Sequence, residues 1–132
     1  MTPQNLYNWL LLQLPELQDK MAVGCIDGNQ REYIGVYDGR PAGGQRICVG
    51  GAACTRYRTK RLRLLVHWTD SPVMAAAKAR QLYDLLYGRS QMDMDGVRVV
   101  AVDPGADIIP VGRDAAGISE YVIEITVTYE RG

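Results

Sequence analysis

The sequence has few of the side chains on which catalytic and metal sites depend. It contains a single histidine, His67, and three cysteines, an odd number at irregular spacing. This pattern argues against a disulfide framework and indicates a reducing compartment. A Cys-His nucleophile pair needs a thiol within hydrogen-bond reach of an oriented base, and no local signature of one is present. Cys48, Cys54 and His67 also lack the tight four-ligand spacing of structural zinc sites.

The sequence also lacks net charge and long apolar runs. Fifteen basic and fifteen acidic residues cancel to a net charge of +0, so the whole chain has no electrostatic attraction to nucleic acid or an acidic membrane. The apolar run Trp9–Leu12 is far shorter than the roughly 20 residues that span a bilayer. No basic segment precedes this run, so we expect no signal peptide and a cytosolic protein.

Glycine is concentrated in one segment. Residues 38–55, DGRPAGGQRICVGGAACT, hold five of the chain's 14 glycines and a proline. This composition predicts a long, flexible loop, interrupted at most by a short strand at Arg46–Val49. The glycines lack the fixed spacing of a dinucleotide fingerprint, and no Gly-Lys-Ser/Thr sequence follows them. They do not indicate a phosphate site, and we expect no cofactor.

The segment Tyr57–Gly88 predicts one strand followed by one helix. Apolar and polar residues alternate up to Trp68, which is the period of a strand with one buried face. Ser71-Pro72 then marks a helix start, because serine is a good N-cap and proline suits the first helical position. We therefore expect a helix at about 72–87 whose alanines lie close against the sheet.

A turn sequence near the N-terminus predicts a β-hairpin. Two short strand-like runs, residues 20–27 and 32–37, flank Asp27-Gly28-Asn29. Such a turn between two runs favours antiparallel pairing, although each run contains a glycine. Cys25 would then lie in the first strand.

Three strands are expected after the main helix. Val97–Val102 is closed by an Asp-Pro-Gly turn, and 108–112 tolerates its proline only at an edge or a bulge. The last strand, Tyr121–Glu130, alternates without glycine or proline and should be central and antiparallel to a neighbour. Asp93 and Asp95, which precede these strands, are expected in a solvated loop.

These elements predict a single α+β domain over residues 1–132. A helix expected between Thr2 and Pro15 and the main helix at about 72–87 pack on one face of an antiparallel or mixed sheet. One face of two strands and one stripe of the main helix should line the core: Leu62, Leu64, Val66, Trp68, Tyr121, Ile123, Ile125, Val127, Ala76, Ala79, Leu82 and Leu86.

One dense basic cluster begins the strand that precedes the main helix. It fits a solvated strand end, a charged surface between subunits, or a nucleic-acid contact. The last is disfavoured because only Tyr57 interleaves the charges and the net charge is zero. The final strand carries glutamates of complementary charge. The candidate subunit interface therefore comprises Arg56, Arg58, Arg61, Arg63, Glu124 and Glu130.

Three segments of the chain carry a resemblance to a known group. They are LLLQLPEL near the N-terminus, the strand-helix unit LRLLVHWTDSPVMAAAKARQLYDLLYG, and the C-terminal ADIIPVGRDAAGISEYVIEITVTYERG. The most specific motif is I-x-x-G-R-D-x-x-G-I-x-E-Y, from Ile109 to Tyr121. In layout and size the chain resembles the minor capsid or tail-completion proteins of long-tailed bacteriophages, a group that includes tail terminators.

This resemblance implies a structural virion protein and not an enzyme. Such a protein forms a ring, most often of six copies, that caps the tail tube and docks it to the head connector. The implied partners are further copies of the chain, the tail tube protein and the head-tail connector protein. No membrane and no sequence-specific nucleic acid are implied, although DNA passes through the ring.

Assembly would take place in the host cytoplasm, with Arg61 or Arg63 and the loop at 38–55 contributing to the ring contacts. Two alternatives stay open. One is a head-completion or neck adaptor protein, and the other is a small cytosolic enzyme that uses Cys48 or Cys54 with His67.

Overall fold

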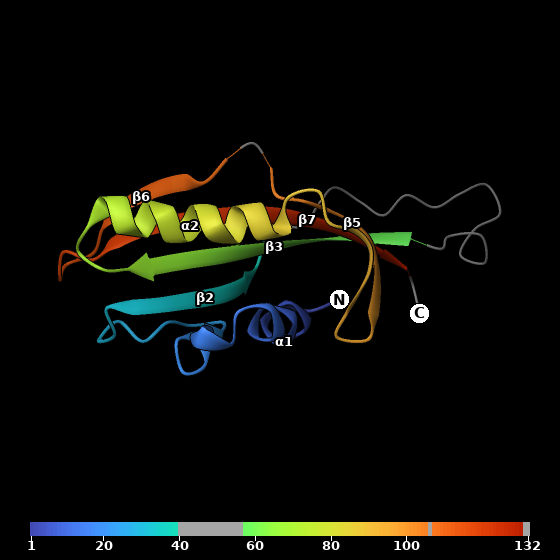
Figure 1. The fold of residues 1–132 in the computed structure, drawn as a ribbon, viewed down its shortest axis with the longest axis horizontal. Helices are drawn as coiled ribbons and strands as arrows, with labels where there is room; N and C mark the ends of the chain where they lie inside the picture. Colours follow the sequence, from blue (N-terminus) through green and yellow to red (C-terminus); the bar gives the residue numbers. More distant parts are fainter. Residues whose placement is uncertain (40–56, 106, 131–132) are drawn as a thin grey trace.

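The structure is a computed structural model that describes residues 1–39, 57–105 and 107–130. Most of the loop predicted at 38–55 lies outside these residues, together with Arg56, Cys48 and Cys54. Figure 1 shows the elements, which in chain order are α1 (Pro3–Gln13), the 3-10 helix η1 (Pro15–Leu17), β1 (Met21–Val23), β2 (Glu32–Asp38), β3 (Tyr57–Trp68), α2 (Pro72–Leu86), β4 (Ser90–Met94), β5 (Val97–Asp103), β6 (Ile109–Arg113) and β7 (Ser119–Glu130).

The strands form one mixed sheet in the order β1-β2-β3-β7-β5-β4, and β6 pairs with β7 beside β5. Strands β1 and β2 are parallel, and the other neighbours are antiparallel. The two longest strands, β3 and β7, form the centre. The expected α+β fold, with an N-terminal helix and one main helix on a mixed sheet, is confirmed.

Alternation along β3 and β7 produces one fully apolar face. Leu62 lies opposite Ile125, and Leu64 lies opposite Ile123, with exposed fractions of 0–1%. The buried residues of α1 and α2 belong to the same core cluster, so both helices cover this face. Of the predicted core residues, all are buried except Tyr121 and Ala76, which are half-buried.

The ends of α2 follow the expected capping chemistry. The Ser71 Oγ accepts a hydrogen bond from the Met74 backbone N–H at 3.4 Å, which satisfies one of the free donors at the helix start. Beyond the last turn, Gly88 adopts a φ of +69°, a left-handed conformation that glycine adopts without a Cβ clash. Local sequence therefore determines where this helix begins and ends.

The predicted hairpin at residues 20–37 is wrong, because β1 and β2 are parallel. The turn at Asp27 does form, and its carbonyl accepts a hydrogen bond from the Gln30 N–H at 3.1 Å. However, the chain leaves β1 at Gly24, with a φ of +78°, and returns so that β2 runs in the same direction as β1. Cys25 is consequently exposed in this connection and does not lie in a strand.

The solvated loop predicted around Asp93 and Asp95 is wrong for Asp93, which lies in a strand, whereas Asp95 does lie in an exposed turn. Residues 90–94 form β4, which pairs antiparallel with β5 through a tight turn at Asp95-Gly96. Both turn residues have positive φ, as a two-residue hairpin turn of type I′ requires. Met94 is fully buried, so the alternation of Met92 and Met94 was the missed strand signal. Among the described residues, no helix has the length and hydropathy to cross a membrane.

Candidate functional site

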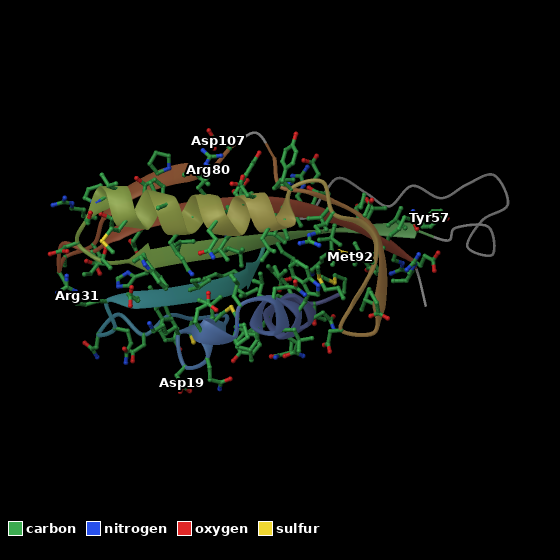
Figure 2. The ribbon with its side chains drawn as sticks, viewed as in Figure 1. Asp19, Arg31, Tyr57, Arg80, Met92 and Asp107 are labelled. Atoms are coloured by element: carbon green, nitrogen blue, oxygen red, sulfur yellow. The ribbon has the colours of Figure 1, made fainter. Side chains whose placement is uncertain are left out.

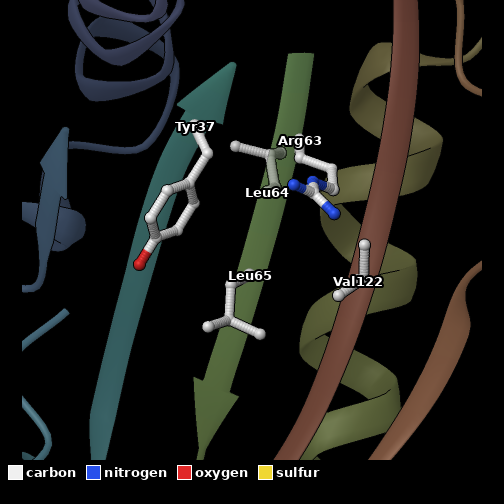
Figure 3. Close-up of a pocket in the computed structure, with 5 residues that line it drawn as sticks. All are labelled: Tyr37, Arg63, Leu64, Leu65 and Val122. Atoms are coloured by element: carbon white, nitrogen blue, oxygen red, sulfur yellow. The ribbon is translucent and has the colours of Figure 1, made fainter. Parts of the chain in front are cut away.

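The sheet has a second face that α1 and α2 do not cover. We call it the open face, and Figure 3 views part of it with α2 behind the strands. Successive residues of a strand point to opposite faces, so the residues that alternate with the core residues point here. The open face as defined comprises Tyr37 of β2, Arg61, Arg63 and Leu65 of β3, and Val122, Glu124 and Thr126 of β7.

A hollow of about 200 Å³ lies on the open face, lined by Tyr37, Arg63, Leu64, Leu65 and Val122. Leu65 is opposite Val122 on one side and opposite Gly35 on the other. The side chains of Leu65 and Val122 are half-buried. The hollow therefore has an apolar floor at the centre of the sheet, with an arginine at its margin.

Gly35 allows an aromatic ring to form one wall of this hollow. A Cβ at this position would lie 2.5 Å from Cε2 of Tyr37 and 2.8 Å from Cγ2 of Ile26. Only a residue without a side chain admits such close packing. Burial raises the pKa of the Tyr37 phenol, and the charges of Cys25 and Glu120 add to this effect. The phenol is therefore neutral near pH 7 and can both donate and accept a hydrogen bond.

Charged residues lie beside the hollow without an ion-pair partner among the described residues. Arg63 is opposite Glu124 in the register of β3 and β7, and opposite Tyr37 in the register of β2 and β3. Arg61 is opposite Thr126. Within the described part of the chain, none of Arg61, Arg63 and Glu124 takes part in an ion pair. As far as the described residues go, these charges can pair with another molecule.

The structure separates the predicted interface residues into two groups. Arg61, Arg63, Glu124 and Glu130 share the parity of the open face, although Glu130 lies at the far end of β7, opposite Tyr57. Arg58 has the parity of the core face, where it is half-buried and its Nε is a buried donor without an acceptor among the described residues. Arg56 lies outside the described residues.

His67 lies on the same side of β3 as Arg61, Arg63 and Leu65, near the C-terminal end of the strand. It is fully buried there, in contacts that the sequence did not reveal. Its Nδ1 lies 3.0 Å from Oε2 of Glu120 and 3.7 Å from Oδ2 of Asp114, and its Nε2 lies 3.0 Å from the carbonyl oxygen of Gln30. A neutral imidazole donates one of the two short bonds, and an imidazolium donates both. The side chain thus connects β3, β7 and the segment before β2.

This arrangement gives His67 a structural position and not the place of a catalytic base. Its Nδ1 and Nε2 both already face oxygen acceptors from the protein itself. Cys25, the cysteine that the structure describes, is exposed in the β1–β2 connection. Among the described residues, no group of three or more His, Cys, Asp or Glu side chains could hold a metal ion.

The sequence matches the family described as bacteriophage tail terminator protein over residues 11–131. The chain belongs to this family. The tail terminator is therefore a structural protein of the phage tail and a component of the virion, and it interacts with other tail and head proteins. The resemblance inferred from the sequence motifs is confirmed.

A solved structure whose name carries no functional description shares the fold of this tail terminator. The two chains superpose with a TM-score of 0.50 at 16% sequence identity, covering 98% of this chain and 95% of the other. No curated protein matches the sequence. The similarity to the solved structure extends over nearly the whole of both chains. At 16% sequence identity it shows that the two proteins share a fold.

Proposed function

We propose that the protein forms a ring that closes the end of the phage tail tube and docks the tube to the head connector. Membership of the tail terminator family supports this role. The observation that carries it is the open face, where an apolar hollow and charges without an ion-pair partner lie at the centre of the sheet, uncovered by the described residues. Residues 1–132 act as a single domain in this proposal, and six copies complete the ring.

The open face has the composition of a contact surface between subunits. Apolar side chains exclude water and contribute most of the affinity, whereas exposed ion pairs contribute only about 0–1 kcal/mol each. Arg61, Arg63 and Glu124 would therefore mainly fix the register of neighbouring subunits. A contact between two unlike surfaces repeats from copy to copy until the ring closes.

The finer functional assignments follow from the same proposal. The ring assembles in the cytoplasm of the host bacterium and becomes part of the tail or neck of the virion. One side binds the tail tube protein and the other binds the head-tail connector protein. DNA passes through the central opening without sequence-specific contacts.

Assembly can be tested with the purified protein, alone and mixed with tail tubes. Sedimentation velocity should show a species several times heavier than the 14.6 kDa chain, and negative-stain electron microscopy should show rings at tube ends. Particles bound only to connectors would instead identify a neck adaptor. A protein that stays monomeric at high concentration and in the presence of tubes would contradict the ring.

A further inference from the structure

Helix α2 carries apolar side chains on the side that faces away from the sheet. Val73 in its first turn is 79% exposed, and Tyr87, the C-cap residue directly after its last turn, is 66% exposed. With Ala77 and Asp84 they lie within one stripe, because residues four, eleven and fourteen positions after Val73 fall on nearly the same side of a helix. We call these four residues the outer stripe.

Three further long side chains lie on or beside this side of α2. Met74 is 56% exposed, Gln81 accepts a hydrogen bond from Lys78 at 3.0 Å, and Arg80 is engaged in an ion pair. Arg80 forms an ion pair with Asp107 at 2.6 Å, and the two are neighbours in Figure 2. The Arg80 guanidinium also lies 5.2 Å from the ring centre of Tyr83. Asp84 is exposed and has no ion-pair partner among the described residues. The outer stripe therefore presents small or apolar residues and one available negative charge.

The outer stripe and the open face point in opposite directions. Helix α2 packs its buried residues into the core on one face of the sheet, and the hollow lies on the other face. Two unlike surfaces on different sides of one molecule allow a heterologous, head-to-tail contact, which closes into a ring when the rotation from copy to copy closes.

We infer that the outer stripe of α2 in one copy docks on the open face of the next copy. This inference rests on the proposed ring and names the contact from which the ring is built. Val73 and Ala77 would lie over the apolar hollow at Leu65, and Asp84 would reach the guanidinium groups of the next copy. The sheet would then lie between two helical layers, its own and its neighbour's.

The spacing of the groups on the two surfaces is compatible with this contact. Ala77 and Asp84 are separated by about 10 Å along the helix, at the usual rise of 1.5 Å per residue. Leu65 and Arg61 are separated by about 13 Å along β3, at roughly 3.3 Å per residue, and Arg63 lies halfway. Both arginines are thus within side-chain reach of the carboxylate when Ala77 covers Leu65. The small Ala77 side chain permits a close approach of helix and sheet.

The apolar half of the contact is tested by a matched pair of substitutions. Val73→Asp should raise the concentration needed for half-assembly by about tenfold or more in sedimentation velocity, because it places a charge in an apolar contact. Leu12→Asp is the control, since Leu12 is an apolar helix residue with a similar exposure of 75% that lies on α1. It should assemble as the parent does, and circular dichroism should show both variants folded.

The charged half is tested by exchanging the charges. Arg63→Glu and Asp84→Arg should each weaken assembly several-fold, and the double variant should recover to near the parent level. Arg98→Glu is the control, because Arg98 is an exposed arginine of β5 outside both surfaces. When it is combined with Asp84→Arg, assembly should stay as weak as in Asp84→Arg alone.

The outcomes separate this inference from the proposed ring. If the parent forms rings but Val73→Asp behaves like Leu12→Asp, or the charge exchange recovers nothing, the contact is wrong and the ring stands. If the parent forms only a dimer, the head-to-tail contact, which repeats from copy to copy, is wrong. If the parent stays monomeric even with tail tubes, both proposals fail.

Discussion

The two faces of strand β3 differ sharply although they alternate residue by residue. Leu62, Leu64 and Val66 on one face have an exposed fraction of 0% and pack under the helices. On the other face, Arg61 and Arg63 are exposed and Leu65 is half-buried. One strand therefore supplies the core through one set of side chains, and through the other a surface that the described helices leave uncovered. Substitutions on the two faces should affect different properties of the protein.

The largest effect on stability is expected on the core face. Ile125→Ala should lower the free energy of unfolding by about 2–5 kcal/mol, because Ile125 is 1% exposed and its removal leaves a cavity. The matched substitution Val122→Ala on the open face should cost less than about 1 kcal/mol. Urea denaturation measures both. A cost below about 0.5 kcal/mol for Ile125→Ala would contradict the assignment of the two faces.

A smaller effect on the free energy of unfolding is expected at His67, which is fully buried at the end of β3. His67→Ala should cost roughly 1–3 kcal/mol, because it leaves the Glu120 carboxylate and the Gln30 carbonyl without their partner. Arg31→Ala is the control, since the Arg31–Asp70 ion pair spans 2.9 Å but both side chains are about two-thirds exposed. It should cost at most about 1 kcal/mol. Equal costs in thermal unfolding would argue against a structural role for His67.

On the open face itself, reversing two charges should leave the fold unchanged. Arg61→Glu with Arg63→Glu should lower stability by no more than about 1 kcal/mol, because both side chains are exposed and the closest new repulsion among the described residues is between position 63 and Glu124 opposite it. The same double variant should weaken or misregister the ring in sedimentation velocity. If it assembles as the parent does, these arginines form only a solvated strand surface.

The smallest effect concerns a contact between α1 and the β4–β5 turn. Side-chain hydrogen bonds from Asn8 and Asn5 hold the pKa of Asp95 below its usual value. A carboxylate with a lowered pKa in the folded state stabilises the fold above its unfolded pKa and loses that contribution as the pH falls below about 4. Asn8→Ala should move the pKa of Asp95 upward in an NMR titration of its carboxyl group. An unchanged pKa would show that this hydrogen bond is not formed in solution.

The sequence predicted the centre of the fold well because local residue patterns determine its strands and its main helix. Alternation predicted β3 and β7, and the Ser71-Pro72 start predicted α2. The direction of β1 was mispredicted, since a turn sequence says that the chain bends but not which strand it then joins. Strand β4 was missed because Met92 and Met94 are its only apolar residues and the other three are polar.

The candidate site was predicted only in its charges. Arg61, Arg63 and Glu124 were proposed as interface residues, but their place beside one another depends on the register of β3 and β7, which no local pattern gives. The hollow was missed because the glycine at position 35 was taken only as a residue that weakens a strand. In the structure, its lack of a side chain leaves space for the Tyr37 ring. The contact of His67 with Glu120 joins residues 53 positions apart and has no local signal.

An electron cryomicroscopy reconstruction of the protein assembled on tail tubes tests the central claim most directly. The account predicts a closed ring in which Leu65 and Val122 are buried under the next copy, with Val73 of that copy beside them. A ring in which the open face is exposed to solvent or lines the central opening would contradict it.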